Sequence, residues 1–465
     1  MSPQIEQRTA WWQTHCVVLF VALGCGSATA GAPTPFAPAA SSEVVLYRHA
    51  TLVDVKALNT RPNMDVLVVG ERIRDVFPDS TPAAMPAAAK VVDLNGSFLM
   101  PGLIDSHVHL ATPPNRRQAE AVLRRNIYGG VTAVRDMADD LRAVGDIARA
   151  SLVGEIAAPD VYYAALMAGP DFFGDERTAQ TSAGGLPGHV PWMRAVTDKT
   201  DLPLAVAEAR GTFATAIKLY ADLTPALARQ ITAEAHRQRV LVWAHATLYP
   251  AKPSDVVAAG VDSISHACLL VREPGARAPG FLQPRPRVDL EHFKAGRDAS
   301  LARLFTSMVR RGTLLDATVW TYGAASPGPS STPPLQPGSC DDVVGGAITR
   351  QAHRAGVQIA AGTDNVAPSS DAWPDLLHEL AALVDKAGMS VPEVIRSATL
   401  IGARATGQQR EIGSIEPGKL ANMVVLALDP LASIDNLKSV EMTIKRGHMY
   451  PRRDFVPLEE GDITD

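Results

Sequence analysis

The feature that most constrains this chain is an alternation of short apolar runs with helical patterns between residues 103 and 364. Eight of these runs have the length and composition of strands. They end near His109, Arg135, Ala164, Lys218, His245, His266, Val319 and Asp364. Strands that alternate with helices form parallel sheets, and eight such units close on themselves. The sequence therefore predicts an α/β fold, a (β/α)8 TIM-type barrel, over residues 101–410.

A second region has short strand-like runs joined by turns and lacks the helical alternation. The runs include 44–46, 65–69 and 90–94, and the same character returns in 418–426 and 439–446. Runs of this kind are typical of a small β domain. We expect both chain ends to build one composite β-sandwich. Its two parts are expected at residues 43–100 and 411–452, followed by a tail at 453–465.

The first thirty residues have the pattern of a signal peptide (1–30). Arg8 precedes an apolar run at 16–23, and an A-x-A cleavage motif ends at Ala30. The apolar run is shorter than the roughly 20 residues that span a bilayer. We expect cleavage after Ala30, a flexible tether over 31–42, and an exported protein, periplasmic or secreted, without a transmembrane segment. A lipoprotein anchor at Cys25 is the alternative.

The charge distribution limits the classes of binding partner, and the cysteine content limits the possible disulfides. The formal net charge of −5 is spread along the chain without a basic stripe, which excludes a nucleic-acid partner. A small molecule or short peptide is the expected partner, and homo-oligomer formation stays open. Cleavage would leave only Cys268 and Cys340. Each could be a small buried hydrophobe, but an oxidising compartment permits a disulfide between them.

Metal-seeking side chains gather at the predicted C-terminal ends of the barrel strands, where active sites of such barrels are built. His107 and His109 are two residues apart on the first strand, so both rings face the same side. Independent surface residues have no reason to fall on one edge of five separate strands. The predicted metal ligands are His107, His109, Lys218, His245, His266 and Asp364.

Lys218 needs its own explanation in such a site. A divalent cation would repel a nearby ammonium in a shielded site, so the lysine must turn away, lose its proton or become an anion. Carboxylation of the amine by carbon dioxide produces an anion that can bridge two metals. The alternative is a lysine at the barrel mouth that binds a substrate carboxylate.

Together these motifs resemble the amidohydrolase superfamily, specifically its imidazolonepropionase-like and Xaa-Pro dipeptidase (prolidase-like) members. The resemblance rests on the segments 98–110, 130–136, 217–220, 235–245, 259–266, 361–364 and 412–422. It implies a barrel with a composite β-sandwich and a binuclear site, most often with two Zn²⁺. It also implies that His107, His109 and Asp364 bind one metal, that His245 and His266 bind the other, and that N6-carboxylated Lys218 bridges them.

A site of this kind supports metal-assisted hydrolysis. Metal binding lowers the pKa of a water from 15.7 towards about 7 and polarises the scissile carbonyl, so a metal-bound hydroxide can attack it. Asp364 is the expected catalytic acid and base, taking the water proton and passing it to the leaving amine. The leading function is an exported metal-dependent amidohydrolase that cleaves the amide bond of a dipeptide or an N-acyl amino acid.

Three alternatives use the same residues. The first is a mononuclear cyclic-amide hydrolase or deaminase, and the number of metals per chain separates it from the leading function. The second is a lactonase or esterase, because the same hydroxide attacks esters. The third, and least favoured, is an exported binding protein without catalysis.

Substrate contacts are expected in the loops after the strands. Two connections are long, 167–201 and 269–292, and long loops of this kind hold substrate or act as lids. The candidate substrate-binding residues are Arg135, Tyr220, His189, Tyr249 and His378. Arg135 could equally form a structural ion pair with Asp136 or Asp139. Relatives often carry a tyrosine shortly after the strand-5 histidine, whereas here Tyr249 follows His245 by four residues.

Overall fold

The structure is a computed structural model that describes residues 43–81, 89–277, 280–283, 287–323, 340–364 and 371–457. The predicted signal peptide (1–30) and tether (31–42) lie outside these residues, as does the end of the predicted tail. Within the described residues, no helix has the length and apolar character needed to span a bilayer.

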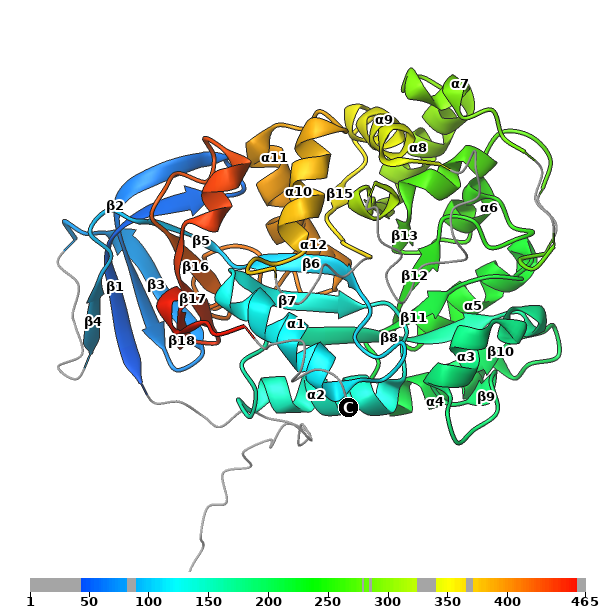
Figure 1. The fold of residues 1–465 in the computed structure, drawn as a ribbon, viewed down its shortest axis with the longest axis horizontal. Helices are drawn as coiled ribbons and strands as arrows, with labels where there is room; N and C mark the ends of the chain where they lie inside the picture. Colours follow the sequence, from blue (N-terminus) through cyan, green and yellow to red (C-terminus); the bar gives the residue numbers. More distant parts are fainter. Residues whose placement is uncertain are drawn as a thin grey trace, which may run out of the picture. The chain divides into compact units, whose positions relative to one another are not determined.

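Eight parallel strands form the barrel (Figure 1). They are β6 (Leu103–Val108), β7 (Val131–Asp136), β8 (Asp160–Ala168), β11 (Ala216–Leu219), β12 (Leu241–His245), β13 (Ser263–Ser265), β14 (Leu314–Asp316) and β15 (Ile359–Ala360). Each strand pairs with the next in chain order. The backbone N–H of Ser106 donates to Ala361 O at 2.8 Å and that of Asp364 to His107 O at 2.9 Å, which joins the last strand to the first. The predicted (β/α)8 barrel is confirmed.

Three strand ends differ from the prediction, one of them that of the eighth strand, which ends at Ala360 and not near Asp364. The third strand continues to Ala168, four residues beyond its predicted end, and the seventh ends at Asp316 and not at Val319. After Asp316 the chain turns away from the sheet, with Thr318 in the left-handed region at φ 46°. That turn places the Thr318 side chain beside the predicted ligands, so the residues after Asp316 belong to the site and not to the sheet.

Helices cover the outside of the barrel. They are α1 (Arg116–Tyr128), α2 (Leu141–Leu152), α3 (Glu176–Thr181), α4 (Leu202–Gly211), α5 (Pro225–Arg237), α6 (Pro253–Ala258), α7 (Glu291–Lys294), α8 (Ala299–Arg311), α9 (Asp342–Arg354), α10 (Leu376–Asp385), α11 (Val391–Arg396) and α12 (Gly402–Ala405). Several begin at a polar side chain that accepts from a first-turn N–H, as Asn115, Asp140 and Thr224 do. Short helical turns are η1 (Pro170–Gly174), η2 (Ala267–Arg272), η3 (Trp320–Tyr322), the π-helical η4 (Ser397–Ile401), η5 (Ile434–Lys438) and η6 (Arg452–Asp454).

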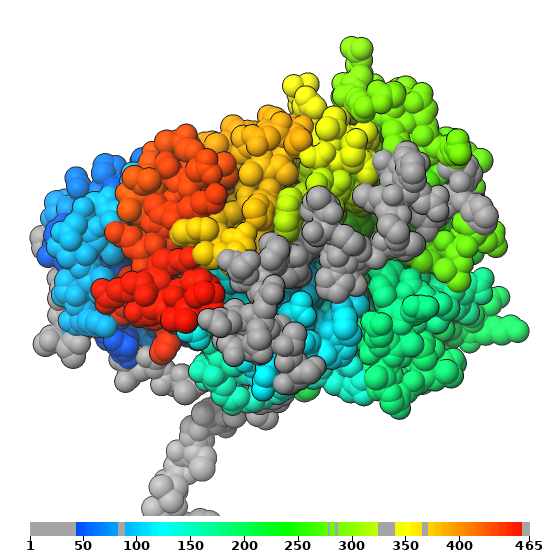
Figure 2. Space-filling view, viewed as in Figure 1, coloured from blue at the N-terminus to red at the C-terminus, as the bar shows by residue number. Residues whose placement is uncertain are grey.

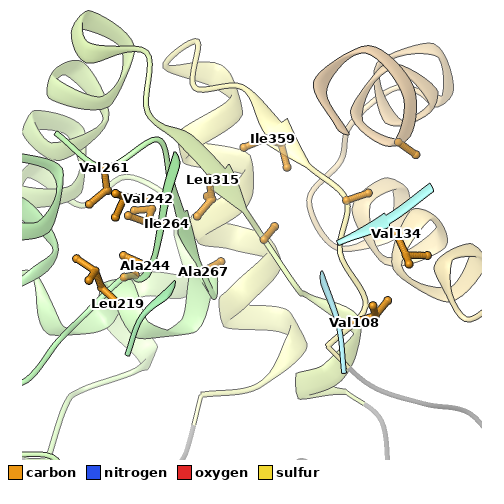
Figure 3. Packing of buried hydrophobic residues seen from close by; sticks show 14 of the residues in the cluster. Val108, Val134, Leu219, Val242, Ala244, Val261, Ile264, Ala267, Leu315 and Ile359 are labelled. Atoms are coloured by element: carbon orange, nitrogen blue, oxygen red, sulfur yellow. The ribbon is translucent and has the colours of Figure 1, made fainter. Parts of the chain in front are cut away.

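Alternate strand residues face two different layers. Val242 and Ala244 of β12 pack with helix residues in the largest apolar cluster, part of which Figure 3 shows, whereas Trp243 belongs to a separate cluster. In β11, Ile217 and Leu219 face the helix layer. The period of two along a strand therefore directs Lys218 and His245 into the barrel interior.

The connection from β8 to β11 is folded onto the barrel. It contains η1, α3, β9 (His189–Val190) and β10 (Met193–Ala195). Strand β10 pairs in parallel with the end of β8, Met193 opposite Leu166, and β9 pairs with β10. The insertion thus extends the barrel sheet beside the C-terminal end of β8.

A second sheet is built from both chain ends. Its strands are β1 (Val44–Asp54), β2 (Asn59–Val69), β3 (Arg72–Pro78), β4 (Lys90–Asp93), β5 (Phe98–Pro101), β16 (Met423–Leu426), β17 (Val440–Lys445) and β18 (His448–Pro451). Strand β16 pairs antiparallel with β5, Met423 opposite Pro101, so the red C-terminal strands lie beside the blue N-terminal ones (Figure 2). This sheet has its own core, which includes Tyr47, Val66 and Val425.

A disulfide joins two elements near the barrel mouth. Cys268 lies in η2, directly after β13, and Cys340 precedes α9; their Cα atoms are 5.7 Å apart. The hypothesised pairing is therefore present. It ties the turn that follows His266 to the start of the α9 segment.

Candidate metal centre

The six predicted ligands converge at the C-terminal ends of the barrel strands. Strands β6, β11, β12, β13 and β15 deliver them to one cleft of about 900 Å³, counted to its open mouth. His107, Lys218, His245 and His266 are buried, while the side chains of His109 and Asp364 keep 19% and 20% of their surface exposed. The cleft is therefore closed at its floor and accessible at one side. We call these six residues the ligand floor.

His107, His109 and Asp364 form the tightest group. The Nε2 atoms of His107 and His109 lie 3.3 and 3.5 Å from Asp364 Oδ1. One donor atom from each of the three residues falls within 4.8 Å of the others. Three donors at this spacing can converge on a single divalent ion.

Each of these two histidines is oriented by a buried carboxylate. His107 Nδ1 donates to Asp316 Oδ2 at 2.6 Å, and His109 Nδ1 donates to Asp139 Oδ1 at 2.6 Å. Metal-binding histidines commonly donate the other ring N–H to a carboxylate, which fixes the tautomer and the ring orientation. The arrangement leaves both Nε2 atoms facing Asp364, so these residues fit a divalent metal.

Lys218, His245 and His266 lie beside this group. The His266 ring centroid is 4.9 Å from that of His107 and 4.7 Å from that of His245. His266 Nδ1 lies 3.5 Å from Asp364 Oδ2. Lys218 Nζ donates to Ser265 Oγ at 3.3 Å, and no carboxylate of the described residues forms an ion pair with it. A second set of donors is therefore adjacent to the first.

The electrostatics of the floor favour neutral donors. Burial lowers the pKa of His107 and of His245, and lowers the pKa of His266 to about 3, so these imidazoles are neutral at pH 7. Burial also lowers the pKa of Lys218 to about 7. His109 differs: burial opposes its charge, but Asp139 holds its pKa well above the usual value.

Asp364 is held as an anion. Burial acts to raise its pKa, but attraction to the His107 and His266 imidazoles where these are protonated, together with the hydrogen bond to His109, holds the pKa below its usual value. Asp316 is also held below its ordinary pKa, against burial, chiefly by His107. Both carboxylates are therefore charged at pH 7.

The backbone is shaped closely around these groups. A Cβ on Gly362 would come within 2.4 Å of Asp316 Oδ1 and 2.6 Å of His107 Cβ, so only glycine fits in the Gly-Thr-Asp segment. His266 and Asp364 have positive φ angles of 76° and 47°. Non-glycine residues in this region are strained, and such strain clusters at functional sites.

Asp105 links the first and last strands under the site. Its Oδ1 accepts from the N–H groups of His107 and Thr363, both at 3.1 Å. Burial raises its pKa to about 8. The junction of the first and last strands, which we call the barrel seam, therefore sets the positions of His107 and Asp364 relative to each other.

The predicted substrate contacts divide into two groups. Tyr220 and Tyr249 line the cleft. Arg135 does not: it is fully buried, and it donates to Asp316 Oδ2 at 2.9 Å and stacks at 4.6 Å over Trp243. Its role is structural, and its partner is neither Asp136 nor Asp139.

The two predicted histidine contacts also lie elsewhere. His189 is exposed on β9, outside the cleft lining. His378 stacks on Trp320 with ring centroids 5.0 Å apart, and its Nε2 lies 3.2 Å from Asp371 Oδ2. Neither histidine is part of the cleft lining, since His189 is exposed and His378 packs on Trp320.

Sequence reasoning missed the residues that support and surround the floor. Asp139, Asp316 and Thr318 position the histidines, and Thr318 Oγ1 lies 3.0 Å from His266 Nδ1. The signal for Asp316 was a lone carboxylate at the end of an apolar strand. Arg177, Phe281 and Tyr322 line the cleft from the connections that follow barrel strands, where no periodic pattern marks them.

Comparison with known proteins identifies the family. The sequence profile of the amidohydrolase family matches residues 98–450, more than half of the chain. The chain belongs to the amidohydrolase family. The resemblance inferred from the strand-end motifs is thereby confirmed, and membership makes the protein a hydrolytic enzyme of the amidohydrolase type.

Curated relatives match over short stretches. The imidazolonepropionase of Legionella pneumophila (strain Corby) is 35% identical over 81 residues, 17% of this chain and 20% of that protein. The 5-methylthioadenosine/S-adenosylhomocysteine deaminase of Teredinibacter turnerae is 33% identical over 111 residues, 22% of this chain and 23% of that protein. The matching stretches span about a fifth of these relatives.

Solved structures of amidohydrolases match over most of the chain. A structure from Bifidobacterium longum, described as a candidate prolidase, has 26% identity and a TM-score of 0.65, covering 91% of this chain and 98% of that one. A. niger ochratoxinase has 20% identity and a TM-score of 0.67, covering 88% and 96%. A Xaa-Pro dipeptidase with bound methionine has 20% identity and a TM-score of 0.66, covering 88% and 100%. The last two likenesses concern the fold alone.

Proposed function

We propose that this chain is an exported binuclear metal-dependent hydrolase that cleaves the amide bond of a dipeptide or an N-acyl amino acid. The single observation that carries the proposal is the convergence of six ligand-type side chains from five strands on one cleft. The carboxylates behind His107 and His109 support it further, because each accepts from the Nδ1 of its histidine, as carboxylates behind metal-binding histidines commonly do.

The floor offers two sets of ligands. His107, His109 and Asp364 would hold one divalent ion, and His245 with His266 the other. Neutral imidazoles and carboxylates are ligands that suit Zn²⁺. When bound, such ions acidify water and polarise the scissile carbonyl.

Lys218 would complete the centre as a carboxylated side chain. Its amine lies in the barrel interior, in contact with Ser265 and without an ion-pair partner among the described residues. Addition of carbon dioxide forms a bond from Nζ to carbon and releases one proton, which gives an anionic carbamate. A carbamate here would supply an anionic ligand for a divalent ion, in place of the repulsion that an ammonium would cause.

Asp364 would move the proton. Its carboxylate, charged and in contact with three imidazoles, lies at the exposed side of the floor. There it can take a proton from the attacking water and deliver it to the nitrogen of the leaving amine. This transfer makes the amine a neutral leaving group and completes cleavage of the carbon–nitrogen bond.

The test combines metal analysis with a substrate panel. Protein reconstituted with Zn²⁺ in bicarbonate buffer should contain two metals per chain and hydrolyse members of a panel of dipeptides and N-acyl amino acids. Reconstitution without bicarbonate should yield less active enzyme. Two bound metals with no hydrolysis of any member of the panel would refute the proposal. Intact-mass measurement of the mature protein tests export and cleavage after Ala30.

A mononuclear hydrolase or deaminase is the second candidate. It is favoured by the compactness of the three-residue group, whose donor atoms lie within 4.8 Å of one another without the other three residues. One metal per chain together with hydrolysis of cyclic amides would support it over the binuclear enzyme.

A further inference from the structure

Arg177 is a cation that the metal chemistry does not use. It lies in α3, in the insertion between β8 and β11, and lines the same cleft as the ligand floor. Its side chain is 22% exposed. Apart from Lys218, which belongs to the floor, it is the one lysine or arginine among the described residues of the lining.

The guanidinium is held in a fixed orientation. Its Nε donates to Asp175 Oδ1 at 2.9 Å and its Nη2 to Asp175 Oδ2 at 2.7 Å. Asp175 is itself the N-cap of α3, accepting from the N–H of Arg177 at 3.0 Å. Asp175 is not part of the cleft lining. The acid therefore anchors Arg177 from behind while the arginine faces the cleft.

Arg177 lies within reach of a substrate on the floor. It hydrogen-bonds Tyr220, and its Cζ lies 6.0 Å from the centre of the Tyr220 ring. That ring contacts the ring of His245 at 3.9 Å. Two contacts, both through Tyr220, therefore connect the guanidinium to the floor. In a substrate whose scissile carbonyl lies on the floor, the carboxylate is within one residue length, about 3.8 Å, of the scissile bond. It can therefore lie between the floor and the guanidinium.

Aromatic rings surround the same position. The Phe172 ring lies 4.4 Å from that of Tyr220 and 5.5 Å from that of Phe281, and the Phe281 ring lies 6.0 Å from that of Tyr249. We call Phe172, Arg177, Tyr220, Tyr249, Phe281 and Tyr322 the cleft wall. An apolar side chain attached beside the carboxylate would pack against these rings.

The cleft has no counterpart for an ammonium group. Among the described residues of the lining, the carboxylates are Asp139 and Asp364. Asp139 accepts from His109, Thr112 and Ala111, and Asp364 contacts three imidazoles of the floor. A charged α-amino group in the substrate would meet no acid that is not already engaged.

From these contacts we infer that Arg177 binds the carboxylate of the substrate, and that the substrate is an N-acyl derivative of an apolar amino acid and not a dipeptide with a free amino terminus. This inference rests on the proposed function and specifies its substrate. A guanidinium carries five N–H donors, so Arg177 can donate to a substrate carboxylate from the edge that does not face Asp175. Tyr220 can contribute its hydroxyl, and the rings of the wall select the side chain.

The decisive experiment compares N-acetyl-L-phenylalanine with N-acetyl-L-phenylalaninol. Both contain the same scissile amide, but the alcohol lacks the carboxylate, and release of acetate reports both reactions. Wild-type enzyme should prefer the acid by kcat/KM. Arg177→Gln should lower kcat/KM for the acid about 10- to 100-fold and leave the alcohol nearly unchanged. Arg177→Lys keeps the charge without the planar set of donors. Its kcat/KM for the acid should lie between the values of wild-type enzyme and Arg177→Gln.

The controls separate this inference from misfolding and from the proposed function. Arg194→Gln changes an arginine of the same insertion that pairs with Glu208 and lies outside the cleft lining, so it should keep the wild-type preference. A misfolded α3 would lower the rates for acid and alcohol together and contradict the assignment. If wild-type hydrolyses both compounds and Arg177→Gln keeps their ratio, the inference alone fails. If reconstituted wild-type enzyme hydrolyses neither compound but cleaves other members of the panel, the inference alone fails. If it cleaves no member of the panel, the proposed function fails with it.

Glycyl-L-phenylalanine tests the amino end. It shares the carboxylate and side chain of N-acetyl-L-phenylalanine but carries an ammonium group. In wild-type enzyme, we expect kcat/KM for this dipeptide to be at least about 10-fold lower than kcat/KM for the N-acetyl compound. Equal or better hydrolysis of the dipeptide would overturn the preference for N-acyl substrates.

Discussion

The ligand floor and the cleft wall are built in different ways. Floor residues lie on strand ends, and each histidine of the first set has a buried carboxylate behind it. Wall residues come from loops and touch mostly other wall residues, as the rings of Phe172, Tyr220 and Phe281 do. The floor is therefore fixed by the barrel, whereas the wall can change without disturbing it. This difference teaches that chemistry and substrate choice are separable in this molecule.

The largest expected effect is on the floor, at Asp364. Asp364→Asn removes the group that accepts and delivers the proton, so kcat should fall by about 10²- to 10⁴-fold. Much of the metal should stay bound, because an amide oxygen and two imidazoles remain. Turnover and metal content per chain are the measurements. Asp371→Asn, on the exposed pair with His378, is the matched control. Wild-type turnover in Asp364→Asn would refute the assignment.

A smaller loss is expected one layer behind the floor. Asp316→Asn keeps the shape but removes the charge that orients His107, so metal affinity or activity should drop about 10- to 100-fold. Competition with a chelator measures the affinity. Asp262→Asn, in the surface pair with His236 at 2.9 Å, removes a similar contact far from the cleft and should change neither quantity. Equal affinities in both variants would mean that His107 needs no carboxylate.

A substitution in the cleft wall should change which substrates are preferred, without changing metal binding or the hydrolysis of small substrates. Phe281→Ala removes ring contacts to Phe172 and Tyr249, so kcat/KM for substrates with large apolar side chains should fall about 10-fold. Substrates with small side chains and the metal content should be unaffected. Phe213→Ala, at an exposed ring, is the control. A parallel loss for small substrates would show that floor and wall are coupled.

The smallest effect concerns stability at the boundary between floor and wall. Buried Glu379 accepts from the N–H groups of Val319 and Trp320. These residues lie in the chain between Thr318, which contacts His266 of the floor, and Tyr322 of the wall. Burial raises its pKa well above the usual value. The folded state therefore keeps a proton that the unfolded state releases, and the stabilisation is lost as pH rises above about 4.5, by at most about 1.4 kcal/mol per pH unit.

The pH dependence of unfolding tests this directly. Denaturant unfolding of wild-type protein and Glu379→Gln between pH 5 and pH 8 should give curves that converge or cross as pH rises, because the variant lacks the titrating group. Metal-free protein is used for both, so that metal release does not contribute. Parallel stability curves would show that Glu379 does not titrate in this way.

The sequence predicted the barrel and the floor for the same physical reason. Strand ends such as those before His245 and His266 follow apolar runs whose period is visible locally, and a barrel brings all such ends together. The composite sheet was also predictable, because the strand-like runs at both chain ends needed partners. Asp316 lay inside the predicted seventh strand, which was expected to end near Val319, and it escaped notice because a carboxylate beneath a histidine has no pattern of its own.

The wall could not be predicted in the same way. Phe172, Arg177 and Phe281 lie in connections whose conformation depends on tertiary contacts, such as the pairing of β10 with β8. Arg135 shows the opposite error: a charged residue at a strand end was taken as a substrate contact, yet its strand position directs it into the barrel interior. Whether a strand residue faces the cleft or another layer depends on its position in the alternation along the strand. An error of one residue in the predicted strand reverses the direction of every side chain.

The seam of the barrel also has a consequence for biosynthesis. His107 and Thr363, which share a hydrogen bond across the seam, are 256 residues apart in the chain. At about 5–20 residues per second, a ribosome needs roughly 10 to 50 s to add the second after the first. During that time the nascent chain holds two histidines of the first set without the aspartate that completes it. This set is therefore complete only once Asp364 has been added, late in synthesis, and a chain that stops before Asp364 lacks part of its centre.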